Sequence, residues 1–200
     1  MSKTAPIDPK GVFINAPFDA AYEPLFITLV GILTFLEYNV HCVLEIREAG
    51  DGRLHRIYEL MRVCRISLHD MSRIGAPVRF NMPFELGLAC SLKLAKPSHY
   101  EIVVLDSKPY RMDRRLSDYK GRDLYTHRGT VSGMTAALLD AFQSPRLEIS
   151  RLPEALRELR ATAQKMKRDA GATTIFHPRL FSTLVKAAAK VATAHGLLAP

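Results

Sequence analysis

The sequence lacks the short motifs that mark the common nucleotide-binding and hydrolase folds. No Walker-type phosphate loop and no GxGxxG follows the first expected strand, which disfavours a P-loop fold or an ordinary dinucleotide fold. No GxSxG elbow is present, and none of the three cysteines has a convincing histidine partner. These absences leave carboxylates and a few polar side chains as the candidates for a functional site.

Cysteines and long apolar runs are also scarce. Cys42, Cys64 and Cys90 are odd in number, have no metal-ligand spacing and each lie in an apolar pattern, so we expect buried free thiols. The histidines show no paired spacing, and no structural metal is predicted. The apolar run around 25–36 is too short to span a bilayer, and no signal peptide is evident. We therefore expect a cytoplasmic protein without a membrane partner.

Positive charge is concentrated in the last quarter of the chain. The net charge is +8, yet from Arg151 onward nine Lys/Arg stand against three Asp/Glu, whereas the first 150 residues carry 19 against 17. A basic tail of this kind is most simply a solvated helix face. Nucleic-acid binding by the tail is the weakest hypothesis, because only Phe176 and Phe181 stand among its charges.

Apolar strand patterns alternate with helical ones along residues 11–145. We expect strands at 11–15, 40–46, 64–70, 101–106 and 123–127, and helices at 24–38, after Gly52, from Asn81, and from Thr130 to Phe142. Such alternation predicts an α/β domain with a parallel sheet, right-handed crossovers and helices on both faces. The strand order 2-1-3-4-5 is expected from the class, with the switch point between the first and third strands.

The ends of the chain fall outside this pattern. Residues 1–10, with two prolines, are expected to be a flexible lead-in. Residues 146–200 carry two apolar stripes, one from Leu152 to Met166 and one from Leu180 to Val191, which predict a basic C-terminal helical hairpin. Because these stripes need partners, we expect the hairpin to pack on the sheet domain or to help form a homo-oligomer.

The candidate site centres on the segment Asn81–Gly87. Asn81 is a good N-cap, Pro83 suits the first turn, and Glu85 would then lie near the positive end of the helix dipole. The preceding strand ends in Asp70, so two carboxylates are expected at the carboxyl edge of the sheet, where open α/β sheets bind ligands. Glu85 on its own is most simply a residue that complements the dipole.

Two carboxylates at such an edge suit chemistry on a sugar that passes through an oxocarbenium ion. One stabilises or attacks the cationic anomeric carbon, and the other binds hydroxyls or manages a proton. The loop from Asn15 to Phe18 is expected to line the same cleft. Phe18 would offer a face for a nucleobase, although a core position is at least as good an interpretation.

Three segments carry a resemblance to a known family. The segments VFINAPFD (12–19), LHDMSR (68–73) and NMPFELGLA (81–89) resemble the nucleoside 2-deoxyribosyltransferase group, and are similar to the related nucleotide-processing Toll/interleukin-1-receptor (TIR) domains of bacteria. The resemblance covers about residues 11–142 and implies a flavodoxin-like fold. It also implies that Glu85 is the catalytic nucleophile, that Asp70 contacts the nucleoside and that residues 16–18 line the pocket.

The chain departs from the transferases in the loop before Glu85. Arg73, Pro77 and Arg79 stand where the transferases carry more acidic residues, which favours a phosphorylated ligand. The resulting hypothesis is cleavage of an N-glycosidic bond in a nucleotide, with NAD as the first candidate substrate and no cofactor. A role in bacterial signalling or phage defence follows from the TIR resemblance alone. The alternative is a non-catalytic module that binds a nucleotide or assembles through TIR-like contacts. The expected substrate-binding residues are Asn15, Pro17, Phe18, Asp70, Ser72, Arg73 and Asn81.

Overall fold

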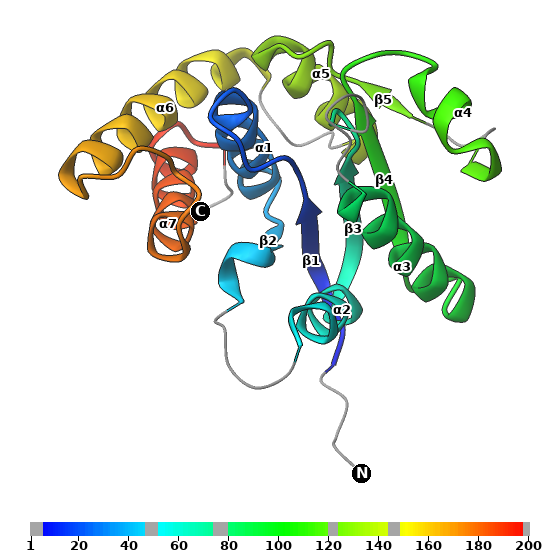
Figure 1. Ribbon diagram of the computed structural model, residues 1–200. Helices are drawn as coiled ribbons and strands as arrows, with labels where there is room; N and C mark the ends of the chain where they lie inside the picture. The colour runs from blue at the N-terminus through cyan, green and yellow to red at the C-terminus, as the bar shows by residue number, and fades with distance from the viewer. Residues whose placement is uncertain (1–5, 47–51, 74–79, 120–123, 144–148, 198–200) are drawn as a thin grey trace.

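A parallel sheet forms the centre of the molecule (Figure 1). The computed structural model describes residues 6–46, 52–73, 80–119, 124–143 and 149–197 of the chain. Among these residues five strands pair in the order β2-β1-β3-β4-β5, all parallel, so the predicted α/β class and strand order are confirmed. The strands are β1 (Asp8–Asn15), β2 (Asn39–Cys42), β3 (Cys64–Asp70), β4 (Glu101–Asp106) and β5 (Tyr125–Thr126).

The helices follow the predicted spacing with shifts at their ends. They are α1 (Glu23–Phe35), α2 (Arg53–Val63), α3 (Asn81–Ala95), α4 (Arg111–Arg115), α5 (Val131–Phe142), α6 (Leu152–Asp169) and α7 (Pro178–Ala194). Thr130 caps α5 as predicted, because its Oγ1 accepts the Gly133 N–H at 3.0 Å. The second strand is shorter than predicted, since Val43–Glu45 form a 3₁₀ turn. The first strand begins at Asp8, inside the expected lead-in.

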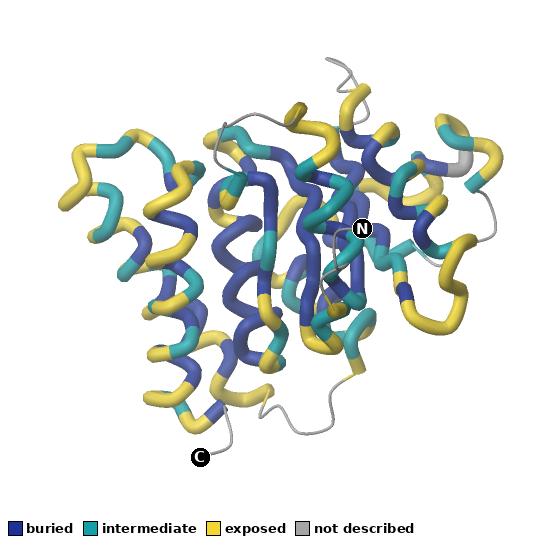
Figure 2. The backbone as a smooth tube through the Cα atoms, turned by 90° about the horizontal axis from the view of Figure 1, so that it is seen from below, coloured by how far each residue is buried: buried dark blue, intermediate teal, exposed yellow. Residues whose placement is uncertain are grey.

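Side chains of the central strands alternate between two apolar layers. In β1, Val12 and Ile14 belong to the core formed with α1 and α5, whereas Phe13 belongs to the core formed with α2 and α3. Near-continuous apolar strands covered on both faces are typical of parallel sheets. Figure 2 shows the strands buried along most of their length, with the exposed residues on the outer helices and loops.

The neighbouring strands β1 and β3 end side by side. Ile14 is in register with Leu68, and Asn15 with His69, so the loops that follow these two strands leave the same edge of the sheet. Because β2 lies on one side of β1 and β3 on the other, the crossover connections run in opposite directions from this point. This is the switch point at which α/β sheets bind ligands.

The C-terminal helices α6 and α7 pack on each other and on α1, forming a layer outside it (Figure 1). Gly31 of α1 permits the close approach, since a Cβ at this position would lie 2.7 Å from Cδ2 of Leu159. The apolar stripes of both helices, including Leu156 and Leu184, are part of the same core as α1. The hairpin stripes are therefore buried against the chain's own sheet domain, so they do not require a second copy.

A buried carboxylate ties this layer to the start of α1. Glu23 Oε1 accepts from Lys167 Nζ at 2.6 Å, and its Oε2 accepts the backbone N–H of Ile175 at 3.0 Å. Phe176 adds a ring contact to Phe26, with centroids 5.3 Å apart. None of the described helices combines the length and the hydropathy that crossing a bilayer requires.

Candidate active site

Glu85 lies in the second turn of α3. The helix begins at Asn81, and the Phe84 N–H donates to the Phe80 carbonyl at 3.2 Å, so Phe80 and not Asn81 occupies the N-cap position. Pro83 is accommodated because N–H groups of a first turn have no partner within the helix. The predicted cap is therefore wrong by one residue, and Glu85 lies just beyond the first turn, where the helix dipole acts on it less strongly than expected.

The carboxyl group of Glu85 is largely removed from water. Glu85 is only 7% exposed, and this burial raises its pKa from 4.5 to about 7. The charge of Arg53, at the start of α2, and a hydrogen bond from the Asn81 side chain act in the opposite direction but do not offset the burial. Glu85 is thus poised between its neutral and ionised forms near neutral pH, as expected of a catalytic carboxyl group.

Asn15 connects the end of β1 to the helix that carries Glu85. Its Nδ2 donates to Nδ1 of His69 at 3.1 Å and to the carbonyl oxygen of Met82 at 3.4 Å. Since Asn15 is 4% exposed, these bonds are formed in the interior. Asn15 therefore holds the first turn of α3 against the carboxyl edge of the sheet.

His69 completes this support as a neutral side chain. It is fully buried, and burial lowers its pKa to about 3. Because its Nδ1 accepts from Asn15, the proton resides on Nε2, which faces the hydroxyl of Ser67. His69 is consequently a fixed acceptor for Asn15 and does not exchange protons near neutral pH.

Asp70 is the centre of a second buried network. Its carboxylate accepts from the hydroxyls of Tyr22 and Ser72, from the Ser72 N–H at 2.8 Å, and from Nε2 of His127 at 3.0 Å. Burial by itself would raise the pKa of Asp70, but the hydrogen bonds from His127, Ser72 and Tyr22 hold it below its usual value. Asp70 is fully buried, and its partners use both carboxylate oxygens.

Ser72, His127 and Asp70 are the residue types of a hydrolase triad, but their arrangement differs. His127 Nε2 faces both partners, at 2.8 Å from Ser72 Oγ and 3.0 Å from Asp70 Oδ2, while its Nδ1 accepts the Gly129 N–H at 3.0 Å. In a triad one ring nitrogen of the histidine bonds the carboxylate and the other bonds the nucleophile. With all three side chains buried, the cluster supports the loops and is not a nucleophilic site.

The two predicted carboxylates lie on different faces of the sheet. Ile66 and Leu68 point into the core with α1, and Asp70, two residues further along β3, shares that side and bonds Tyr22 at the start of α1. Glu85 belongs to α3, which covers the opposite face with Met82 and Leu86. Asp70 and Glu85 therefore reach the carboxyl edge from opposite faces of the sheet, and a pocket shared by the two side chains stays a prediction. Glu85 instead has Asn81 and Arg53 as its polar neighbours.

The remaining predicted residues have internal partners. Arg73 forms a two-pronged ion pair with Asp19, at 3.0 and 3.1 Å, which joins the loops after β3 and β1. Phe18 packs edge-on against Phe26 and Phe176, with centroids 5.7 and 5.4 Å apart. Pro17 is buried, while Asn81 is exposed. Pro77 and Arg79, which suggested a phosphorylated ligand, lie outside the described residues.

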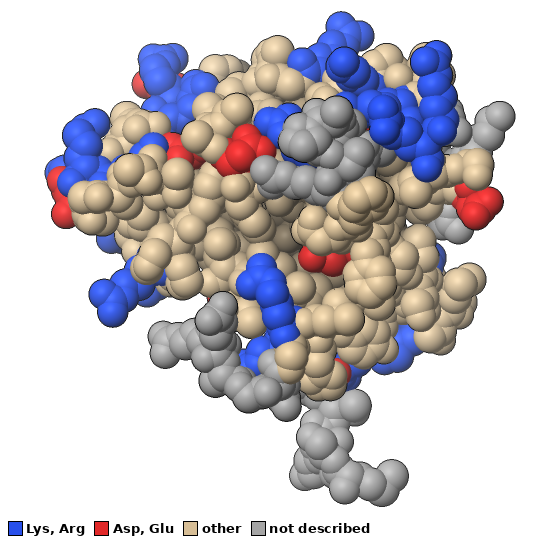
Figure 3. Space-filling view, viewed as in Figure 1, with Lys and Arg blue, Asp and Glu red and all other residues tan. Residues whose placement is uncertain are grey.

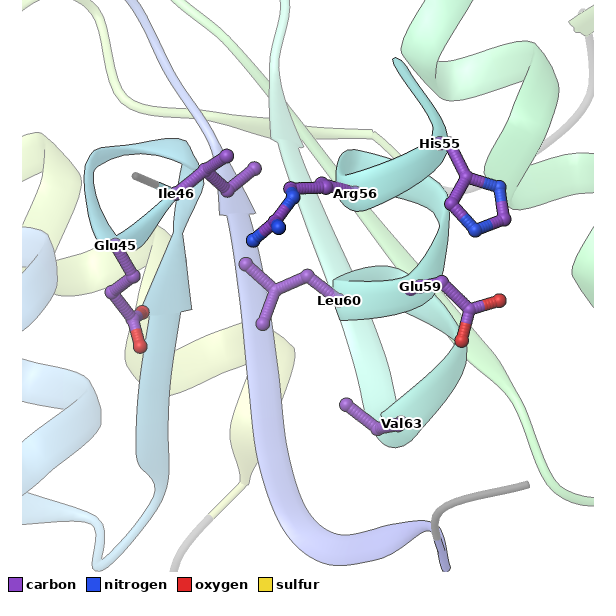
Figure 4. Close-up of a pocket in the computed structure, with 7 residues that line it drawn as sticks. All are labelled: Glu45, Ile46, His55, Arg56, Glu59, Leu60 and Val63. Carbon is purple, nitrogen blue, oxygen red and sulfur yellow. The ribbon is translucent and has the colours of Figure 1, made fainter. Parts of the chain in front are cut away.

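A separate cavity of about 530 Å³ lies between the 3₁₀ turn after β2 and helix α2 (Figure 4). Its carboxylates have partners of their own: Glu45 accepts the Cys42 N–H at 2.8 Å, and Glu59 pairs with Arg62. Figure 4 shows Arg56 and Leu60 extending from α2 toward Ile46. No α3 residue lines this cavity, so it is distinct from the surroundings of Glu85.

The sequence did not reveal Tyr22, His69 and His127, which have the largest roles in the two networks. Only the position of His127 at the end of an expected strand was a usable signal. In comparisons with known proteins, no family model, curated protein or solved structure matches the chain.

Proposed function

We propose that the protein cleaves an N-glycosidic bond of a nucleotide, with Glu85 as the catalytic carboxylate and NAD as the first substrate to test. The observation that carries the proposal is the buried carboxyl group of Glu85, whose pKa is raised to about 7 beside the switch point of the sheet. The parallel sheet of order 2-1-3-4-5, which is compatible with a flavodoxin-like fold, and the sequence segments that resemble the deoxyribosyltransferases and TIR domains support it further.

The reaction requires negative charge where the sugar becomes positive. As the bond from the anomeric carbon to the base breaks, both electrons leave with the base and the sugar becomes an oxocarbenium ion. Ionised Glu85 stabilises this ion or forms a covalent bond to its anomeric carbon. Water, or an acceptor base in a transfer reaction, then bonds to the anomeric carbon. A carboxylate that lacks water is held in an unfavourable state until this charge develops, so it stabilises the transition state more than the ground state.

A cationic substrate fits this environment. The nicotinamide ring of NAD is positively charged while it is bonded to ribose, and it leaves as a neutral base. Such a substrate would favour the ionised form of Glu85, lowering its pKa on binding. Arg53 supplies a cation whose charge acts on Glu85, and a guanidinium group suits the phosphate groups of a nucleotide. A role in bacterial signalling or phage defence is part of the proposal.

The test is a substrate screen. The protein is incubated separately with NAD, NADP, nucleoside monophosphates and deoxynucleosides, and the products are separated by chromatography. We expect release of a free base from a phosphorylated substrate, and no release with Glu85→Gln. Release from deoxynucleosides alone, in the presence of an acceptor base, would instead indicate deoxyribosyl transfer.

A non-catalytic nucleotide-binding module, or a TIR-like signalling or assembly module, is the second candidate. The observation that favours it is the internal use of two predicted ligand-binding residues: both carboxylate oxygens of Asp70 accept hydrogen bonds from the protein, and Phe18 packs against Phe26 and Phe176. Nucleotide binding measured by calorimetry without base release from any substrate would support this function over catalysis.

A further inference from the structure

The outer face of α3 carries an exposed apolar seam. Its members recur at alternating spacings of four and three residues, which is the repeat of helices that pack against other helices. The seam consists of Phe80, Phe84, Gly87, Ser91 and Leu94, all exposed. Phe80 and Leu94 are each 79% exposed and Phe84 54%, which is unusual for side chains of this size.

The side of α3 opposite the seam is buried and also apolar. Met82, Leu86 and Ala89 bury the opposite side of the helix against the sheet, so α3 is apolar on both sides. By contrast, the solvent face of α6 carries charges such as Glu154 and Arg157. A helix that is apolar all round is normally buried all round. Figure 3 shows mostly uncharged surface where α3 lies in Figure 1.

Gly87 lies at the middle of the seam and has no packing role among the residues that the structure describes. A Cβ at Gly87 would meet nothing within 4 Å, whereas a Cβ at Gly31 would press on Leu159. Glycine within a helix lowers its stability relative to alanine. A helix from another molecule could approach α3 closely at Gly87, as α6 approaches α1 closely at Gly31.

We propose that the seam is a two-fold interface between two copies of this chain. Its side chains are large at both ends and small in the centre, so an antiparallel crossing at Gly87 sets Phe80 and Phe84 of one copy against Ser91 and Leu94 of the other. A surface that complements itself in this way is what a two-fold dimer requires. The seam carries no charge, so two chains of net charge +8 meet where their repulsion is least.

The area available is sufficient for such a contact. With about 150–250 Å² for a large side chain, the exposed parts of Phe80, Phe84 and Leu94 amount to about 400 Å² per copy. Two copies and the flanking residues of a 15-residue helix bring the total near the ~1,000 Å² of a specific interface. The interface does not depend on the proposed reaction, although Glu85 directly follows Phe84.

Sedimentation velocity of the full chain tests the proposal. We expect the wild type to have the mass of two chains and Phe84→Glu to have the mass of one. Ile149→Glu is the matched control, because Ile149 is 62% exposed on a different surface and its variant should remain dimeric. Equal melting curves for Phe84→Glu and Ile149→Glu at concentrations where the wild type dissociates would show that the fold is intact. A monomeric wild type, or a dimeric Phe84→Glu, would overturn the proposal.

Cross-linking tests the position of the two-fold axis. Gly87→Cys should form a covalent dimer within minutes under mild oxidation, because the axis brings the two introduced thiols together. Gly52→Cys is the control, since a Cβ at Gly52 also meets nothing within 4 Å. The unsubstituted chain measures the background from Cys90. Equal cross-linking of the two variants would contradict the proposed geometry.

Discussion

Nε2 of His127 lies 3.0 Å from Oδ2 of Asp70, with both side chains completely buried. The bond joins the loop after β5 to the end of β3, and Tyr22 links the same carboxylate to the start of α1. Three loops at the carboxyl edge thus share one anchor. The arrangement makes Asp70 a structural residue at the base of the candidate site.

Asp70→Asn should destabilise the fold strongly, because an amide NH₂ would replace an oxygen that accepts a hydrogen bond. We expect a loss of about 1–3 kcal/mol in the free energy of unfolding, as when a buried hydrogen-bond partner is left unsatisfied. Urea unfolding at pH 7 measures it, and a loss below about 1 kcal/mol would contradict the role of Asp70 as anchor.

The same carboxylate gives the fold an acid-sensitive component. The pKa of Asp70 is lower in the folded protein than in the unfolded chain, so the unfolded chain binds more protons as the pH falls below its ordinary pKa. The stabilisation is therefore present above about pH 4 and is lost as the pH falls through the folded pKa. Unfolding curves of the wild type and Asp70→Asn should converge toward low pH, and parallel pH profiles would contradict this.

Glu23→Gln should loosen the attachment of α6 and α7. The substitution breaks a buried ion pair with Lys167 and weakens the bond to the Ile175 N–H, with an expected cost of about 2–4 kcal/mol. Glu37→Gln is the control, because the Glu37 pair with Lys10 is exposed and contributes about 0–1 kcal/mol. Amide hydrogen exchange of α6 and α7 should increase in the first variant only. Unchanged exchange would show that Glu23 does not hold these helices.

Glu85→Gln should stabilise the fold at alkaline pH. Because burial raises the pKa of Glu85 to about 7, the folded protein binds more protons than the unfolded chain between about pH 4.5 and 7. The free energy of unfolding of the wild type therefore falls as the pH rises through this interval. Glutamine has no proton to lose, so the variant should gain up to about 3 kcal/mol relative to the wild type by pH 8. A variant that is less stable than the wild type at pH 8 would contradict the raised pKa.

Local patterns in the sequence were sufficient to predict the sheet and most of its helices. Cys64–Asp70 and Glu101–Asp106 were predicted to the residue, because each is an apolar run between clear breaks. The cap of α3 was misplaced by one residue, since Asn81 with Pro83 two residues later also fits the start of a helix. The placement of Asp70 and Glu85 on opposite faces of the sheet was not predicted, because it depends on which face each strand residue and each helix occupies in the folded sheet. The partners of Asp70 could not be predicted either, because Tyr22 and His127 are far from it in the sequence.

The catalytic role of Glu85 is tested by comparing wild type and Glu85→Gln in the turnover of NAD, or of the nucleotide that the screen identifies. At pH 8, where Glu85 is ionised, we expect the variant to lose at least about 10²-fold in rate, the scale of removing one charge-stabilising group. Nucleotide affinity should fall much less than the rate, because the charge is needed mainly in the transition state. The wild-type rate should also rise with pH through about 7. A variant that keeps full turnover would remove Glu85 from the mechanism and contradict the account.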